Sequence, residues 1–179
     1  MKADKIITIF GSSRVRKGGK SYRQAYQLGK LLAEAGFVIC NGGYRGSMEA
    51  SAMGAKEAGG KTVGITTEVF KGAKPNQWID IESHAESYIQ RLMILTAVAD
   101  AFIVLRGGLG TLGEMALVWT LTEVEEMQKP IILLGDEWHK TIEDLSKHLM
   151  IRDSDLDILN LADTPEEALE LLNEIWPDK

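Results

Sequence analysis

The chain has 179 residues, of which 45% are hydrophobic, and it carries a formal net charge of −6. That length is typical of one domain, here residues 1–179, and allows a core that needs no disulfide or metal ion; the single cysteine, Cys40, has no partner for an internal disulfide. The acidic balance argues against a general nucleic-acid-binding protein, and no apolar run reaches the length of a membrane span. Because the N-terminal residues also lack the long apolar core of a signal peptide, we expect a cytoplasmic protein with no membrane partner.

Short apolar runs alternate with segments of helical periodicity along the whole sequence. The exception is a polar, proline-containing stretch at residues 67–83, which has no clear period. In chain order, the pattern predicts a strand at residues 6–10, a helix at 22–34, a strand at 37–40, a helix at 46–58, a strand at 62–66, a short strand near 78–81, a helix at 87–97, a strand at 101–105, a helix at 111–127, a strand at 130–134, a helix at 138–150, a strand at 158–161 and a last helix from Thr164.

The predicted strands are continuous apolar runs rather than alternating ones. Such strands are typical of a parallel sheet whose two faces are both covered by helices. We therefore predict an α/β fold, a doubly wound, Rossmann-like parallel sheet with helices on both faces. Sheets of this kind bind ligands beyond the carboxyl ends of their strands, near the point where the strand order reverses.

Three of the predicted strands end in glycine-containing turns that lead towards helices. Glycine lets the backbone approach a ligand closely, and the helix N-terminus behind it offers unpaired N–H groups to an anion. Tight turns alone are the simpler explanation for any one of these sites, but three at the same sheet edge favour a phosphate or nucleotide site. The candidate phosphate-binding residues are Gly11, Ser12, Ser13, Gly42, Gly43, Gly46, Arg106, Gly107, Gly108, Gly110 and Thr111.

Two common nucleotide-binding motifs do not match the chain. The turn at Gly11 lacks the G-x-G-x-x-G spacing of the dinucleotide fingerprint, and Asn41 stands where an acidic residue is expected. No segment forms a full Walker A loop. The three histidines are scattered and make no metal-ligand pattern with Cys40. These features weaken NAD and ATP binding as hypotheses, and we expect no metal and no redox cofactor.

Two charged side chains near the predicted ligand edge are candidates for chemistry. Glu114 follows Thr111 by three positions at the start of a predicted helix. This spacing suits a capping box, with Thr111 as N-cap and Glu114 at N3, and it suits a catalytic carboxylate equally well. Arg91 precedes an apolar stretch of its predicted helix. It either marks a solvated helix end or reaches the sheet edge to bind a phosphate or carboxylate.

The stretch R-G-G-L-G-T-L-G-E at residues 106–114 is similar to the P-G-G-x-G-T-x-x-E hallmark of the LOG ("lonely guy") family, with only the leading proline changed. Three further pieces occur in the family's order: F-G-S-S at 10–13, G-G-x-x-G-x-M at 42–48, and Arg91 followed by D-A-F-I at 100–103. The resemblance covers roughly residues 6–135. Members are often labelled lysine decarboxylases, but no lysine here stands in a context that favours pyridoxal phosphate.

The resemblance implies a specific activity. LOG proteins cleave the N-glycosidic bond of a nucleoside 5′-monophosphate and release the base and ribose 5-phosphate. By this resemblance, Arg91 and Glu114 are the catalytic pair, residues 107–111 hold the phosphate, and no cofactor is needed. The resemblance also implies a homodimer or higher homo-oligomer with the site near the subunit interface.

One segment departs from the LOG pattern. Where the family has G-G-G-s-x-G-L-M-G, residues 41–49 are N-G-G-Y-R-G-S-M-E. This segment resembles a sister branch that includes molybdenum-cofactor carriers. The alternative function is therefore a non-catalytic carrier or binding protein for a phosphorylated heterocycle such as molybdenum cofactor. The related protein DprA binds single-stranded DNA, which the acidic balance disfavours here. Under either hypothesis the expected partner is a nucleoside monophosphate or a related small phosphorylated ligand.

Overall fold

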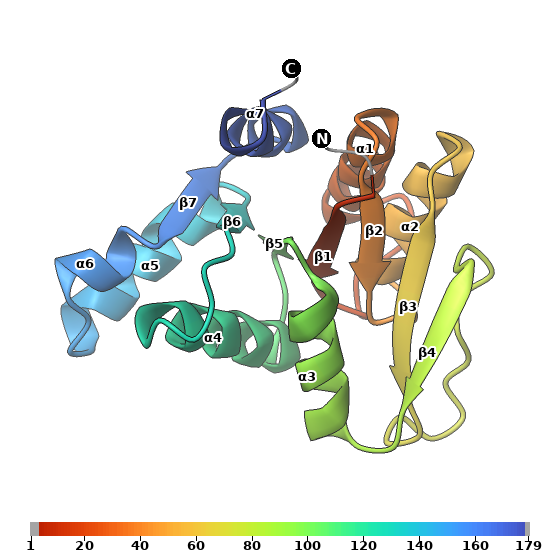
Figure 1. Cartoon of the computed structure of the whole chain (residues 1–179), viewed down its shortest axis with the longest axis horizontal. Helices are drawn as coiled ribbons and strands as arrows, with labels where there is room; N and C mark the ends of the chain where they lie inside the picture. The colour runs from red at the N-terminus through yellow and green to blue at the C-terminus, as the bar shows by residue number, and fades with distance from the viewer. Residues whose placement is uncertain (1–3, 178–179) are drawn as a thin grey trace.

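A computed structural model describes residues 4–177 of the chain (Figure 1). Its helices and strands alternate along the sequence as expected from the apolar pattern. In chain order the elements are β1 (Ile6–Phe10), α1 (Lys20–Glu34), β2 (Val38–Asn41), α2 (Ser47–Glu57), β3 (Thr62–Thr67), β4 (Ile81–Ala85), α3 (Tyr88–Val98), β5 (Ala101–Leu105), α4 (Leu109–Glu123), β6 (Ile131–Leu134), α5 (Glu137–His148), α6 (Asp153–Leu156), β7 (Leu159–Ala162) and α7 (Pro165–Ile175).

The strands form one seven-stranded sheet in the order β4-β3-β2-β1-β5-β6-β7, and every neighbouring pair is parallel. The predicted doubly wound α/β fold is therefore confirmed. The strand order reverses beside β1, which pairs with β2 on one side and with β5 on the other. Ligand sites in such sheets lie at this reversal, outside the carboxyl ends of the strands.

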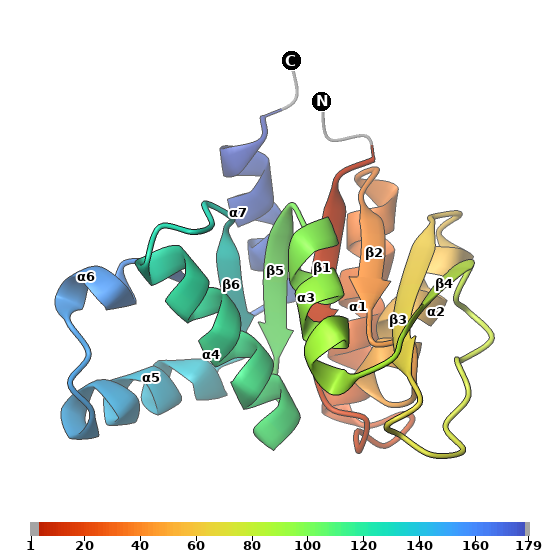
Figure 2. The same cartoon turned by 60° about the horizontal axis from the view of Figure 1, so that its bottom comes forward.

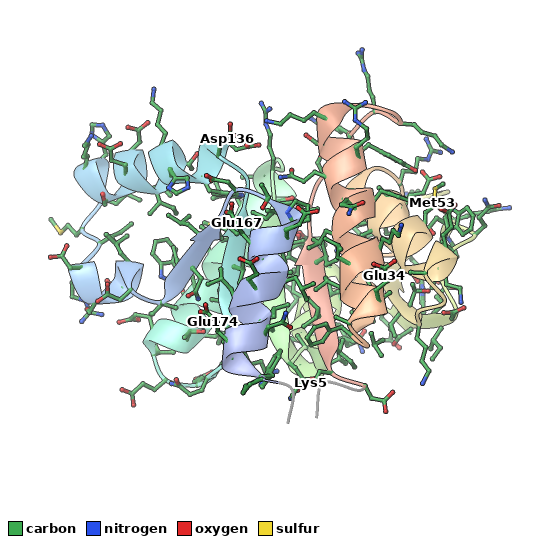
Figure 3. The ribbon with its side chains drawn as sticks, turned by 90° about the horizontal axis from the view of Figure 1, so that it is seen from above. Lys5, Glu34, Met53, Asp136, Glu167 and Glu174 are labelled. Atoms are coloured by element: carbon green, nitrogen blue, oxygen red, sulfur yellow. The ribbon has the colours of Figure 1, made fainter. Side chains whose placement is uncertain are left out.

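Helices cover both faces of the sheet. Alternate residues of each strand face opposite sides, so Ile7 and Ile9 pack against α1 while Phe10 packs on the other face. One core lies under α1, α2 and α7, and Figure 3 shows these three helices side by side. The second core lies under α3, α4 and α5, and Figure 2 shows α3 and α4 in front of the sheet. Among residues 4–177, no helix has the length and apolar character needed to cross a bilayer.

Most elements lie within two residues of their predicted bounds, and the differences that matter concern three elements. The short strand after the irregular stretch is β4, which lies a few residues beyond the predicted range 78–81. The single turn α6 was not expected. Helix α4 begins at Leu109, with Gly108 as its N-cap, so Thr111 lies in the first turn and is not the cap. This last shift changes the interpretation of Glu114.

Candidate active site

A cavity of about 1160 Å³ lies at the carboxyl edge of the sheet, beside the strand reversal. The loops that follow β1, β2 and β3 line it, together with the N-terminal parts of α3 and α4. Figure 2 shows both helix N-termini at the lower edge of the sheet, where β5 ends. The site therefore occupies the position that a doubly wound sheet favours for a ligand.

Arg91 enters this cavity from the first turns of α3. The Ser87 hydroxyl caps that helix by accepting a hydrogen bond from the Gln90 amide at 3.1 Å. Arg91 is only 4% exposed, and its Nε donates to the Ile65 carbonyl at 2.8 Å. Its Nη1 lies 3.5 Å from Oε1 of Glu114. The hypothesis that Arg91 marks a solvated helix end is therefore wrong.

Glu114 lies in the second turn of α4 and is 8% exposed. The capping-box hypothesis is wrong, because Gly108 is the N-cap and no side chain caps the helix. Burial raises the pKa of Glu114 to about 7, and the nearby positive charge of Arg91 opposes that rise. A carboxyl group with this pKa exists in both protonation states near neutral pH and can exchange a proton with a bound ligand or water.

An aromatic wall stands beside the Arg91–Glu114 pair. The Arg91 guanidinium lies 5.9 Å from the ring centroid of Tyr44 and 5.7 Å from that of Phe70. Tyr44 is fixed through its hydroxyl, which donates to the Thr67 carbonyl at 2.9 Å and accepts from the Thr67 amide at 2.8 Å. Phe70 also makes an edge-on contact with Tyr88, with ring centroids 6.1 Å apart. These rings offer faces against which a flat heterocycle can stack.

The N-terminus of α4 provides unpaired amides at the same cavity. The Leu112 amide bonds to the Gly108 carbonyl at 2.9 Å, which leaves the amides of Leu109, Gly110 and Thr111 without an acceptor in the helix. Three such amides, at the positive end of the helix dipole, suit a phosphate. A Cβ on Gly107 would lie 2.1 Å from Oγ1 of Thr111, so glycine is required there for the turn to close.

The other two glycine turns pack against each other and shape the cavity floor. The Ser47 amide, at the start of α2, donates to the Ser12 carbonyl at 3.1 Å. A Cβ on Gly46, whose φ is +70°, would lie 2.2 Å from that same carbonyl oxygen. A Cβ on Gly42 would lie 1.8 Å from Nη2 of Arg91. The glycine at position 42 thus makes room for the guanidinium.

The cavity gathers most, but not all, of the residues predicted from the sequence. Gly43, Gly46 and Gly107 lie within the turns without lining it, and the exposed Arg106 pairs with Glu137 instead, with Nε 3.5 Å from Oε1. No sequence motif indicated that the aromatic residues line the site. Phe70 belongs to the stretch without a period, so no pattern pointed to it. The predicted residues that line the cavity are Gly11, Ser12, Ser13, Gly42, Arg91, Gly108, Gly110, Thr111 and Glu114.

The structure also explains Asn41, which replaces the acidic residue of a dinucleotide site. Its buried side chain donates to the Met48 carbonyl at 3.0 Å and to the Ser51 hydroxyl at 3.1 Å, and it accepts from the Gly43 amide at 2.8 Å. Asn41 thereby braces the β2–α2 turn. In the part of the chain that the structure describes, no group of three or more His, Cys, Asp or Glu side chains is arranged to hold a metal ion.

Comparison with known proteins places the chain among LOG-like proteins. It is 29% identical over 151 residues to a cytokinin riboside 5′-monophosphate phosphoribohydrolase of Rhodococcoides fascians, an alignment that covers 82% of this chain and 76% of that protein. An uncharacterised protein of Archaeoglobus fulgidus is 36% identical to this chain over 126 residues, an alignment that covers 70% of this chain and 82% of that protein.

Among solved structures, the molybdenum cofactor binding protein of Rippkaea orientalis superposes with a TM-score of 0.79 at 29% identity, covering 98% of this chain and 99% of that one. Residues 4–168 match the SLOG cluster4 family. The chain therefore belongs to the LOG-like SLOG cluster4 family.

Proposed function

We propose that this protein hydrolyses the N-glycosidic bond of a nucleoside 5′-monophosphate, releasing the base and ribose 5-phosphate. The observation that carries the proposal is the buried Arg91–Glu114 pair, which faces the same cavity as the free amides at the N-terminus of α4. The phosphoribohydrolase named among the relatives supports it at the family level. Helix α4 begins after Gly108 with no side-chain cap, so neither Glu114 nor Arg91 serves to start this helix.

The proposed complex follows from the shape of the cavity. The 5′-phosphate sits on the amides of Leu109, Gly110 and Thr111, because an anion is stabilised at a helix N-terminus. The base stacks on the wall formed by Tyr44, Phe70 and Tyr88. The ribose then lies between these two subsites, next to Glu114.

The reaction needs only the groups of this site. As the bond from C1′ to the base nitrogen breaks, its electron pair leaves with the base, and positive charge develops on C1′ and the ring oxygen. An ionised Glu114 stabilises that charge and accepts a proton from the water that attacks C1′. The proton then passes from Glu114 to the nitrogen of the departing base, which restores the carboxylate and releases neutral base and ribose 5-phosphate. Arg91, held by the Ile65 carbonyl, fixes the carboxylate in place.

A non-catalytic carrier of a phosphorylated heterocycle is the second candidate. The full-length superposition on the molybdenum cofactor binding protein favours it, as does the Tyr44 ring wall, which would also hold a pterin. A carrier requires the helix N-terminus and the ring wall but does not require Glu114 to be ionisable. The two candidates therefore differ in what Glu114 does.

Base release from a panel of nucleotides separates the two candidates. We expect wild-type protein to release free base from at least one of the 5′-monophosphates of adenosine, N6-modified adenosine, guanosine, cytidine and uridine. Glu114→Gln should lower that rate by about 100-fold or more, since a charge-stabilising group is lost, while Glu137→Gln, outside the cavity, should leave it unchanged. No release from any nucleotide at high protein concentration would contradict the proposed activity.

The proposal includes a second copy of the chain. Helices α3 and α4 carry apolar side chains on their outer sides, where Ile89 and Met93 are 66% and 64% exposed and Leu109 is 86% exposed. Leu109 also lines the cavity, so this face adjoins the site. We infer that these exposed apolar side chains form an interface, which a two-fold dimer would cover with the same surface of its partner.

Met93→Glu tests this dimer. The variant places a charge on the exposed apolar side of α3 and should shift the protein from dimer to monomer in sedimentation velocity. Lys140→Glu, on the exposed side of α5, serves as the charge control and should leave the dimer intact. A wild-type monomer at micromolar concentration would contradict the proposal.

A further inference from the structure

Four cationic side chains from the loops after β1, β2 and β3 line the cavity. Arg14 follows β1, Arg45 follows β2, and Lys71 and Lys74 follow β3. We refer to these four residues as the outer cation cluster. Within residues 4–177, none of the four lies within 4.0 Å of a carboxylate, because the ion pairs of the described chain all involve other residues.

The charge of the cavity is opposite to that of the protein. The whole chain has 20 Lys and Arg against 26 Asp and Glu. The cavity, by contrast, is lined by the outer cation cluster and Arg91 against only Glu49 and Glu114. Since Glu114 faces Arg91, Glu49 alone remains to balance the cluster. An acidic protein that gathers unpaired cations around one cavity creates a local positive potential that attracts an anionic ligand.

The loops after β2 and β3 begin well away from the N-terminus of α4. Neighbouring strands lie about 4.8 Å apart, and β5, β1, β2 and β3 follow one another across the sheet. The loops after β2 and β3 therefore start about 10 to 15 Å from the end of β5, where α4 offers its amides. The cavity volume of about 1160 Å³ exceeds the range of about 300 to 1000 Å³ that is usual for small-ligand pockets.

We propose that the ligand carries a second anionic group, a carboxylate or a phosphate, at the end remote from its 5′-phosphate, and that the outer cation cluster binds it. This inference rests on the proposed function in placing the 5′-phosphate at α4. Phe70 directly precedes Lys71, so the ring wall and the cluster share one loop. A base stacked on Phe70 thus presents its outer edge to the cluster. The substrate class is a nucleotide whose base bears an acidic substituent, or a dinucleotide with a 5′-phosphate.

Binding of matched nucleotides tests this inference. Isothermal titration would compare AMP, N6-benzyl-AMP, which adds bulk without charge, N6-succinyl-AMP, which adds two carboxylates, and the dinucleotide pApA, which adds a second phosphate. We expect N6-succinyl-AMP or pApA to bind at least tenfold more tightly than N6-benzyl-AMP at low salt, with the advantage falling as salt is raised. The tighter of the two identifies the second group as carboxylate or phosphate.

Variants assign the gain to the cluster. Lys71→Met/Lys74→Met should remove most of the advantage of the doubly anionic ligand while leaving AMP binding within about twofold, because AMP carries no second anionic group for these side chains to bind. Arg16→Met, a cation on the β1–α1 loop that does not line the cavity, should change neither.

The outcomes keep the two proposals separate. Equal affinities for N6-benzyl-AMP and both doubly anionic ligands would overturn the inference. They would not contradict the proposed hydrolysis of a nucleoside 5′-monophosphate. A doubly anionic advantage without base release would support the cluster and contradict the hydrolase. If no nucleotide bound at all, both proposals would fall.

Discussion

Replacing Glu114 with glutamine should change how the stability of the protein depends on pH. Burial raises the pKa of Glu114 from 4.5 to about 7 in the folded protein. The folded state therefore holds this proton more tightly than the unfolded state. The resulting stabilisation is fully present below pH 4.5 and is lost as the pH rises through 7. A shift of this size corresponds to roughly 2 to 3 kcal/mol between pH 5 and pH 8.

Urea unfolding at pH 5, 6, 7 and 8 measures this effect. Relative to Glu114→Gln, wild-type protein should lose roughly 2 to 3 kcal/mol of unfolding free energy across that range, because only the wild type must ionise a buried carboxyl group. The exposed substitution Glu126→Gln controls for a general effect of removing one charge. Parallel pH profiles for wild type and Glu114→Gln would refute the assignment of a raised pKa to Glu114.

Three further predictions concern the reaction and its geometry. Base release by wild-type protein should rise with pH through about 7, as Glu114 ionises, and a rate that falls across this range in a stopped assay would show that the protonated form acts instead. Arg91→Lys should reduce base release by about 100-fold, because a single ammonium group cannot contact the Ile65 carbonyl and Glu114 with the geometry of the planar guanidinium. Comparable kcat values for the two proteins would contradict this role. Gly42→Ala should destabilise the protein by about 1 to 3 kcal/mol in thermal unfolding, since the new Cβ would meet the Arg91 guanidinium, and an unchanged Tm would show that the arginine can move aside.

The sheet could be predicted from sequence because its central strands carry the signal themselves. Strand β5, for example, is buried along its whole length and is predicted at the residues where it occurs. Strand β4 lies at the sheet edge, is mostly exposed and contains Glu82, Ser83 and His84, so its apolar pattern is weak. Helix α6 is a single turn of four residues, which is too short to show a period.

The site was only partly predictable, for a physical reason. The spacing of Thr111 and Glu114 satisfies a helix cap and a catalytic carboxylate equally well. The cap is excluded only by the residue at which α4 begins, because Gly108 takes the cap position and no side chain caps the helix. Likewise, no sequence pattern shows that the Arg106 side chain lies outside the cavity and pairs with Glu137.

The ring wall and the outer cation cluster depend on tertiary contacts. Phe70, Lys71 and Lys74 come from the irregular connection between β3 and β4, and they reach the site only because that loop folds back over the ends of the strands. The loop is anchored by Asn76, whose side chain donates to the carbonyls of Gly43 and Tyr44 at 3.1 and 2.8 Å. Contacts of this kind follow from the folded chain and not from any local period.

The proposed function requires one cavity to hold a nucleotide phosphate on the N-terminus of α4 and to present the glycosidic bond to Glu114. A crystal structure of the Glu114→Gln variant with AMP tests it most directly. We expect phosphate oxygens within about 3 Å of the amides of Leu109, Gly110 and Thr111, with C1′ beside the side chain at position 114. A phosphate bound elsewhere in the cavity, or a ribose turned away from position 114, would contradict it.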